Sequence, residues 1–109
     1  MVMSVIVVET YVVKAEKRAE FEPALKEFIE FKERNVELFS GLKSWKLYRQ
    51  EFGAIGGMYI EMWEYENMEE MDRINTRIFS DKGMKKIQNG FHFLIDPATF
   101  SASIWVPVA

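Results

Sequence analysis

The chain has 109 residues, 49% of them hydrophobic, and its 14 basic and 17 acidic residues give a formal net charge of -3. This length suits one domain, so we expect residues 1–109 to form a single domain. The absence of cysteine excludes disulfides, thiolate metal sites and cysteine nucleophiles, and one histidine cannot build a multi-histidine metal site. We therefore expect no metal and no cofactor.

The N-terminal segment predicts a cytoplasmic protein. Residues 1–8 lack a basic leader, and Glu9 follows too soon for a signal peptide. No apolar run approaches the roughly 20 residues that a membrane-spanning helix needs, so we expect no membrane partner. Basic and acidic residues are interleaved rather than gathered in a stripe, which disfavours nucleic acid as a partner.

The first half of the chain predicts a strand, a helix and a hairpin. Residues 4–13 are β-branched and aromatic, as in a central strand. In residues 17–39, apolar side chains recur three and four positions apart, which predicts a helix. Residues 42–50 and 57–65 alternate with period two and predict two strands joined by the glycine-containing loop 52–56.

The second half predicts a helical region followed by one more strand. Asn67 is placed to cap a helix that begins at the next residue. Residues 80–83 interrupt this helix, and a further helix is expected to reach about Phe91. Asp96–Pro97 then turns the chain into a last strand, residues 99–106.

The order strand, helix, strand, strand, helix, strand is the ferredoxin-like βαββαβ pattern. Right-handed crossovers give an α+β fold with a four-stranded antiparallel sheet in the order 4-1-3-2 and both helices on one face. Pro107, at the end of the last strand, suits the edge position that this order assigns to it.

Alternation divides the predicted sheet into two sets of side chains. The apolar set, expected under the helices, is Ile6, Val8, Val12, Trp45, Leu47, Met58, Ile60, Met62, Phe100, Ala102, Ile104 and Val106. The aromatic and polar set, expected on the other face, is Glu9, Tyr11, Ser44, Lys46, Tyr48, Tyr59, Glu61, Trp63, Tyr65, Ser101, Ser103 and Trp105. A hairpin register that pairs Lys46 with Glu61 and Tyr48 with Tyr59 matches opposite charges and aromatic rings.

The aromatic and polar face predicts a homodimer. Its tyrosines and tryptophans form a larger apolar patch than the few hundred Å² that a monomer usually exposes. No further helix is available to cover it, so we expect a second copy of the chain to close two sheets into one barrel.

Two glutamates are the candidate general bases. Glu61 and Glu9 lie on the two central strands and are expected to point into the barrel together, where desolvation raises the pKa of a carboxyl group. The alternative is structural: Lys46 pairs with Glu61, and the cluster only fixes the register of the dimer.

Six further side chains are candidates for contacting a small aromatic ligand. They are Lys46, Tyr48, Tyr59, Trp63, Tyr11 and Trp105. Tyrosine and tryptophan are also common interface anchors, so the same residues fit a dimer contact without a ligand. His92 falls at the end of the last helix, where positive charge is favoured, and no catalytic partner for it is evident from the sequence.

The pattern resembles the dimeric α/β-barrel superfamily, in particular its antibiotic-biosynthesis monooxygenase-like and NIPSNAP-like families. The resemblance rests on the βαββαβ order, on residues 57–64 leading through Asn67 into a Met-rich helix, and on Asp96–Pro97 before the last strand. It implies a fold shared by cofactor-free oxygenases, isomerases, haem-degrading enzymes and proteins without known activity. Haem degradation is not expected, because residues 68–91 contain neither the Trp nor the His that such relatives carry there.

Two functions remain open from the sequence. The first is a homodimeric ligand-binding or assembly module without strong catalysis. The second is a cofactor-independent monooxygenase or isomerase that acts on a small aromatic or polyketide-like substrate with a glutamate as general base.

Overall fold

The computed structural model describes residues 4–53 and 56–109. Its strands are β1 (Val5–Val12), β2 (Ser44–Arg49), β3 (Met58–Tyr65) and β4 (Ser101–Trp105). Its α-helices are α1 (Arg18–Arg34), α2 (Met68–Ser80) and α3 (Lys82–Leu94), and short 3₁₀ segments span Ala15–Lys17, Val36–Phe39 and Pro97–Thr99. Ala54 and Ile55, in the predicted hairpin loop, lie outside the described residues.

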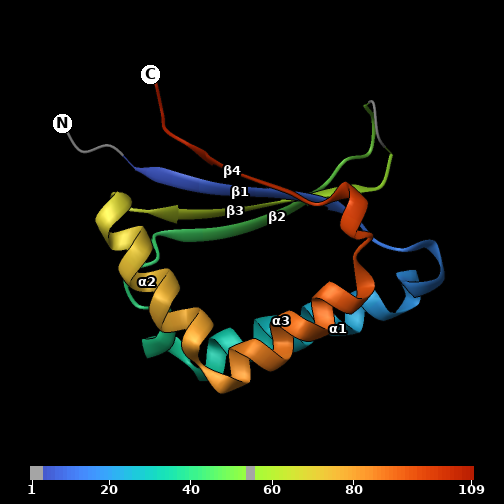
Figure 1. The fold of residues 1–109 in the computed structure, drawn as a ribbon, viewed down its shortest axis with the longest axis horizontal. Coiled ribbons are helices and arrows are strands. Elements are labelled where there is room, and N and C mark those ends of the chain that lie inside the picture. The colour runs from blue at the N-terminus through green and yellow to red at the C-terminus, as the bar shows by residue number, and fades with distance from the viewer. Residues whose placement is uncertain (1–3, 54–55) are drawn as a thin grey trace.

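The four strands form one antiparallel sheet in the order β2-β3-β1-β4. This is the predicted 4-1-3-2 order counted from the other edge, so the ferredoxin-like topology is confirmed. β4, which precedes Pro107, lies at an edge as expected. Figure 1 shows the strands as one layer and the three helices as a second layer against one of its faces.

Local sequence explains where α2 and α3 begin. The Asn67 side chain accepts a hydrogen bond from the backbone N–H of Glu70 at 2.8 Å and so caps α2 as predicted. Asp81 caps α3 in the same way through the N–H of Met84. The predicted helix 17–39 is shorter than expected, because α1 ends at Arg34 and a 3₁₀ segment follows.

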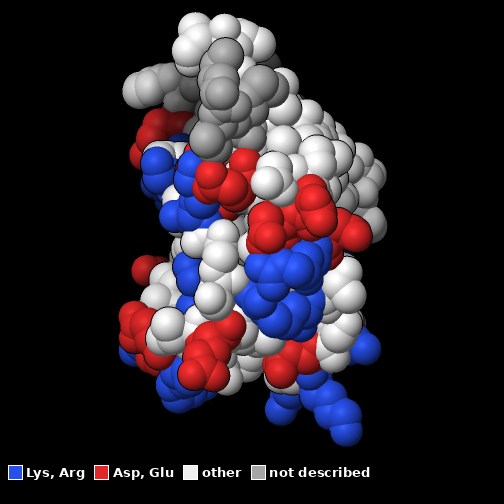
Figure 2. All heavy atoms as spheres, turned by 90° about the vertical axis from the view of Figure 1, so that its left-hand side faces the viewer, with Lys and Arg blue, Asp and Glu red and all other residues white. Residues whose placement is uncertain are grey.

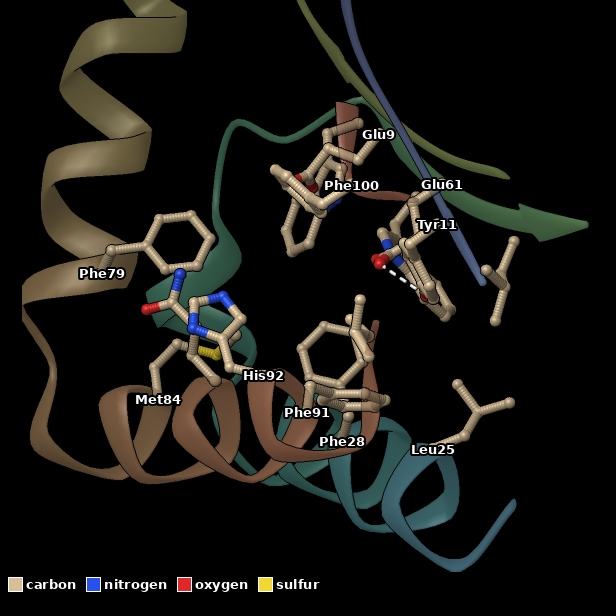
Figure 3. Close-up of a pocket in the computed structure, with 15 residues that line it drawn as sticks. Glu9, Tyr11, Leu25, Phe28, Glu61, Phe79, Met84, Phe91, His92 and Phe100 are labelled. Atoms are coloured by element: carbon tan, nitrogen blue, oxygen red, sulfur yellow. Dashed lines mark hydrogen bonds between the residues drawn. The ribbon is translucent and has the colours of Figure 1, made fainter. Parts of the chain in front are cut away.

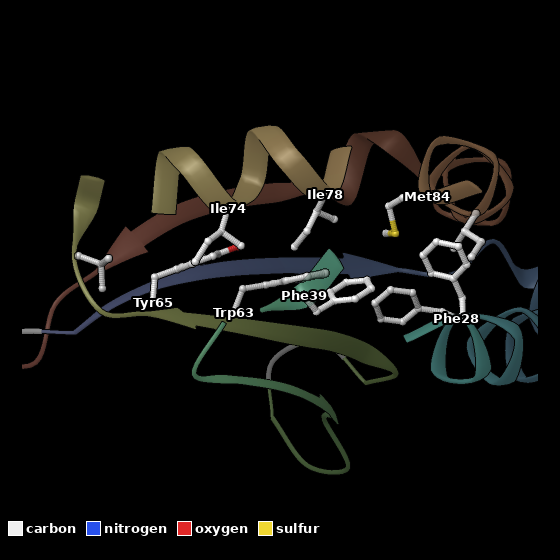
Figure 4. Packing of buried hydrophobic residues seen from close by; sticks show 10 residues of the cluster. Phe28, Phe39, Trp63, Tyr65, Ile74, Ile78 and Met84 are labelled. Carbon is white, nitrogen blue, oxygen red and sulfur yellow. The ribbon is translucent and has the colours of Figure 1, made fainter. Parts of the chain in front are cut away.

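The main core lies between the sheet and the helices (Figure 4). Its buried side chains include Val5, Phe28, Phe31, Phe39, Trp63, Tyr65, Ile74, Ile78, Met84 and Ile87. A second cluster at the other end contains Tyr11, Val13, Phe21, Leu94 and Ile95. Two tyrosines from the strands are thus fully buried, and each hydroxyl has an acceptor: Tyr11 donates to Glu61, and Tyr65 donates to Asn75.

The predicted faces are correct for β2 and β4 and wrong for β1 and β3. The sheet face that packs on the helices, here called the inner face, carries Val5, Val7, Glu9, Tyr11, Trp45, Leu47, Tyr59, Glu61, Trp63, Tyr65, Phe100, Ala102 and Ile104. The opposite, outer face carries Ile6, Val8, Thr10, Val12, Ser44, Lys46, Tyr48, Met58, Ile60, Met62, Glu64, Ser101, Ser103 and Trp105.

The error on the faces and the error in the hairpin register have one cause. Leu47, not Lys46, is the partner of Glu61, and Ile60, not Tyr59, is the partner of Tyr48. A slip of one residue moves every side chain of a strand to the other face. The predicted Lys46–Glu61 ion pair is therefore absent, since the two side chains lie on opposite sides of the sheet.

The surface shows no field of one charge on the side seen in Figure 2, where acidic and basic side chains lie next to one another. Among the described residues, no helix has both the length and the apolar composition needed to cross a bilayer.

Candidate functional site

A cavity of about 70 Å³ lies between the inner face of the sheet and the helices (Figure 3). The strands contribute Glu9, Tyr11, Trp45, Leu47, Glu61 and Trp63. The helices contribute Leu25 and Phe28 from α1, Phe79 from α2, and Met84, Gln88, Phe91 and His92 from α3, and the lining is completed by Ile95 and Phe100. The walls are therefore mainly apolar and rich in aromatic rings, with two carboxylates in the sheet.

Glu9 and Glu61 are direct cross-strand partners on the two central strands. In an antiparallel pair, opposite residues point to the same side, so both carboxylates face the cavity. Like charges in this position destabilise a sheet, and nothing in the packing requires two acids there. A pair that works against folding in the interior of a domain is typical of a functional site.

Glu61 is held by two hydrogen bonds. The Tyr11 hydroxyl donates to Oε2 at 2.9 Å, and the Trp45 indole Nε1–H donates to Oε1 at 2.9 Å. Both carboxyl oxygens act as acceptors, as suits an ionised carboxylate. Burial and the negative charge of Glu61 raise the pKa of Tyr11, which keeps its hydroxyl protonated as the donor.

Glu9 has a different environment. Burial raises the pKa of Glu9 to about 7, and the Glu61 carboxylate opposite it adds to this increase. The Trp63 indole N–H favours ionised Glu9 and moderates the increase, although Nε1 lacks hydrogen-bond geometry to any described residue. Glu9 is therefore about half ionised near neutral pH, the condition under which a carboxyl group exchanges protons best.

Trp63 is the second unusual group. Only 4% of the residue is exposed, it lines the cavity, and its Nε1 has no hydrogen-bond partner among the described residues. A buried donor without an acceptor costs free energy, so such groups are rare in folded proteins. This one lies beside the carboxyl group that changes charge near neutral pH.

The structure separates the predicted site residues into two groups. Glu9, Glu61, Tyr11 and Trp63 meet at the cavity, and Tyr59 stacks on Tyr11 at 5.9 Å without lining it. Lys46, Tyr48 and Trp105 lie on the outer face, so the prediction that they share one face with the glutamates is wrong.

None of the helical residues that line the cavity is among the site residues predicted from the sequence. Met84, Gln88, Phe91 and His92 come from one side of α3, and their spacing of three and four residues is the pattern that could have indicated it. His92 is exposed but borders the cavity. No group of three or more His, Asp or Glu suited to a metal ion occurs within residues 4–53 and 56–109.

Comparison with known proteins gives the fold its context. No family model matches the chain. No curated protein matches its sequence. Solved structures do match: a NIPSNAP family protein from Agrobacterium tumefaciens has a TM-score of 0.74 at 15% identity, over 96% of this chain and 86% of that one.

Two further structures are similar over nearly the whole chain. A cofactor-independent oxygenase from Streptomyces nogalater has a TM-score of 0.67 at 16% identity and covers 97% of this chain and 94% of its own. A putative antibiotic biosynthesis monooxygenase from Nitrosomonas europaea has a TM-score of 0.69 at 10% identity, over 99% of this chain and 93% of that one. The chain thus has the ferredoxin-like fold that NIPSNAP family proteins and antibiotic biosynthesis monooxygenases share, which confirms the resemblance expected from its sequence.

Proposed function

We propose that the chain is a homodimeric small-molecule-binding protein whose ligand occupies the cavity between sheet and helices, with Glu9 as the group that exchanges a proton with it. The observation that carries this proposal is the pair Glu9 and Glu61, two facing carboxylates inside an aromatic cavity. The buried Nε1 of Trp63 supports it, because a donor in the cavity wall without a hydrogen-bond partner among the described residues is rare in folded proteins and is typical of a functional site.

The dimer proposal rests on the outer face. Its centre is aliphatic, with the half-buried side chains of Ile6, Met58, Ile60 and Met62 on the two central strands. At its edges Tyr48 is 52% exposed and Trp105 is 53% exposed. No described helix covers this face (Figure 1), and an apolar patch of this kind marks an interaction surface. A second copy placed face to face buries both patches at once.

Ile60→Lys tests the dimer. Ile60 lies in the middle of the outer face, between Tyr48 and Thr10, so the substitution places an unpaired charge in the proposed interface. We expect the dissociation constant of the dimer to rise by at least about a hundredfold in sedimentation velocity experiments. Thr76→Lys, which adds the same charge to the exposed surface of α2, should leave it unchanged. A monomeric wild-type protein at micromolar concentration contradicts the proposal.

A second candidate function is a cofactor-independent monooxygenase or isomerase. The pKa of about 7 suits Glu9 to act as a general base, and one structure of the same fold is a cofactor-independent oxygenase. In this function Glu9 accepts a proton from a phenolic or enolisable substrate that is neutral when it enters the cavity.

Turnover experiments with Glu9→Gln test the second candidate. We expect aerobic turnover of an accepted phenol to fall by about 10²–10⁴-fold, because glutamine cannot accept the proton. Glu64→Gln is the matched control, since Glu64 lies on the neighbouring central strand, β3, and on the outer face of the sheet. Equal rates for Glu9→Gln and wild type rule out this function.

A further inference from the structure

The charges that line the cavity have one sign. Glu9 and Glu61 supply two carboxylates, and no Lys or Arg is found among the described lining residues. His92 is the basic residue of the lining, and its side chain is exposed near the end of α3. Of the groups that change the pKa of Glu9, none is a cation. An anionic ligand is therefore repelled, and a cation is attracted.

The positive charge nearest the aromatic walls lies outside the cavity. Lys32 from α1 places its Nζ 4.6 Å from the ring centroid of Trp45 and 5.9 Å from that of Phe28. Lys32 does not line the cavity, and burial lowers its pKa. One such charge does not neutralise two carboxylates, so the cavity keeps a net negative charge when Glu9 is ionised.

The walls are of the kind that bind cations. Aromatic side chains line the cavity from every element that forms it: Tyr11, Phe28, Trp45, Trp63, Phe79, Phe91 and Phe100. The faces of such rings attract an ammonium group, most strongly where water is excluded. Aromatic rings combined with carboxylates form the usual binding site for an alkylammonium group.

We infer that the ligand of this cavity is a protonated amine, whose ammonium group lies between Glu9 and Glu61 and whose carbon body packs against the aromatic rings. This inference rests on the ligand-binding proposal and favours it over the oxygenase function. In the oxygenase, deprotonation of the substrate gives a phenolate, and the negative charge of Glu61 repels that anion. A bound ammonium keeps Glu9 ionised, and the Trp63 indole N–H beside Glu9 favours the same ionised form. The volume of about 70 Å³ suits a compact amine with a short chain.

Three compounds with the same four-carbon chain test the inference: n-butylamine, 1-butanol and butyrate. Binding is measured by NMR from the indole Nε1–H signal of Trp63, with that of Trp105 on the outer face as the internal reference. At about pH 8 we expect the amine to bind at least about tenfold more tightly than the alcohol, and butyrate not to bind. Affinities are expected to be roughly millimolar, as is usual for ligands of this size.

The pH dependence identifies the carboxyl group involved. The amine stays protonated from about pH 6 to pH 8, whereas Glu9, with a pKa of about 7, becomes ionised across this range. The affinity for butylamine should therefore rise about tenfold from pH 6 to pH 8. Glu9→Gln should abolish this rise, and Glu64→Gln should retain it.

The outcomes separate the two proposals. If butanol or butyrate perturbs the Trp63 signal at least as strongly as butylamine, the amine inference is wrong and the ligand-binding proposal stands. If none of the three compounds perturbs it, the ligand-binding proposal itself is wrong.

Discussion

Glu9→Gln is expected to stabilise the protein by up to about 3 kcal/mol at pH 8 and to leave its stability near pH 4.5 almost unchanged. The pKa of Glu9 is about 7 in the folded chain and 4.5 when the side chain is free in water. Between these values the folded state holds more protons than the unfolded state, so the free energy of unfolding falls as the pH rises. Glutamine has no charge to bury, so the variant does not lose this stability as the pH rises.

Urea denaturation from pH 4.5 to pH 8 measures this effect. The wild-type protein should lose stability across the range, whereas the variant should show a flatter profile. Glu27→Gln, at an exposed position on α1, should follow the wild-type profile within about 0.5 kcal/mol. If Glu9→Gln destabilises the protein at pH 8, Glu9 is ionised and stabilised in the folded state, contrary to our description.

Phe28→Ala is expected to destabilise the protein by about 3–5 kcal/mol and to enlarge the cavity. Phe28 is 2% exposed, and its ring packs against Trp45 at 5.1 Å, Trp63 at 6.0 Å and Phe91 at 6.3 Å. Because Phe28 also lines the cavity, the space left by its ring adds to the existing volume. The variant should then accept a benzene-sized molecule, which raises its melting temperature.

Phe39→Ala is the matched control for this experiment. Phe39 is 8% exposed and belongs to the same core cluster, but it does not line the cavity. The Phe39→Ala variant should lose as much stability as Phe28→Ala, but benzene should not raise its melting temperature. Phe28→Leu serves where the alanine variant does not fold. Equal stabilisation of the Phe28 and Phe39 variants by benzene contradicts the position assigned to the cavity.

The order of elements and the sheet topology followed from the sequence because they depend on local pattern and chirality. Asn67 ahead of a helical segment and Pro107 at the end of an edge strand have the same meaning in any fold. Which face of β1 and β3 packs on the helices could not be predicted from the sequence. Both alternating sets of side chains on these strands are apolar enough to be buried.

Alternation favours the aliphatic set for the core and the aromatic set for the interface. On β1 and β3 the aromatic set is buried instead, because the hydroxyl groups of Tyr11 and Tyr65 each have a hydrogen-bond acceptor inside the fold. These acceptors come from distant positions in the chain, Glu61 and Asn75. Opposite charges on Lys46 and Glu61 also suggested a register that the packing overrides.

The candidate site was predicted in part. Four of its residues share a face because they belong to the same alternating set on adjacent strands: Glu9, Glu61, Tyr11 and Trp63. They stay together whichever face of the sheet packs on the helices. The helical half of the cavity depends on how α3 packs against α1 and the sheet, which no local pattern specifies. Gln88 and His92 were therefore not predicted as neighbours of the glutamates.

The most direct test of the central claim is a titration of the glutamate carboxyl groups by ¹³C NMR, with Glu9 assigned by comparison with Glu9→Gln. A titration midpoint of about 7 for Glu9, shifted when butylamine is added, is the predicted result. If Glu9 instead titrates near the ordinary value of 4.5, it is solvated or paired in the folded protein, and the cavity does not hold the proton-exchanging group on which the proposed function depends.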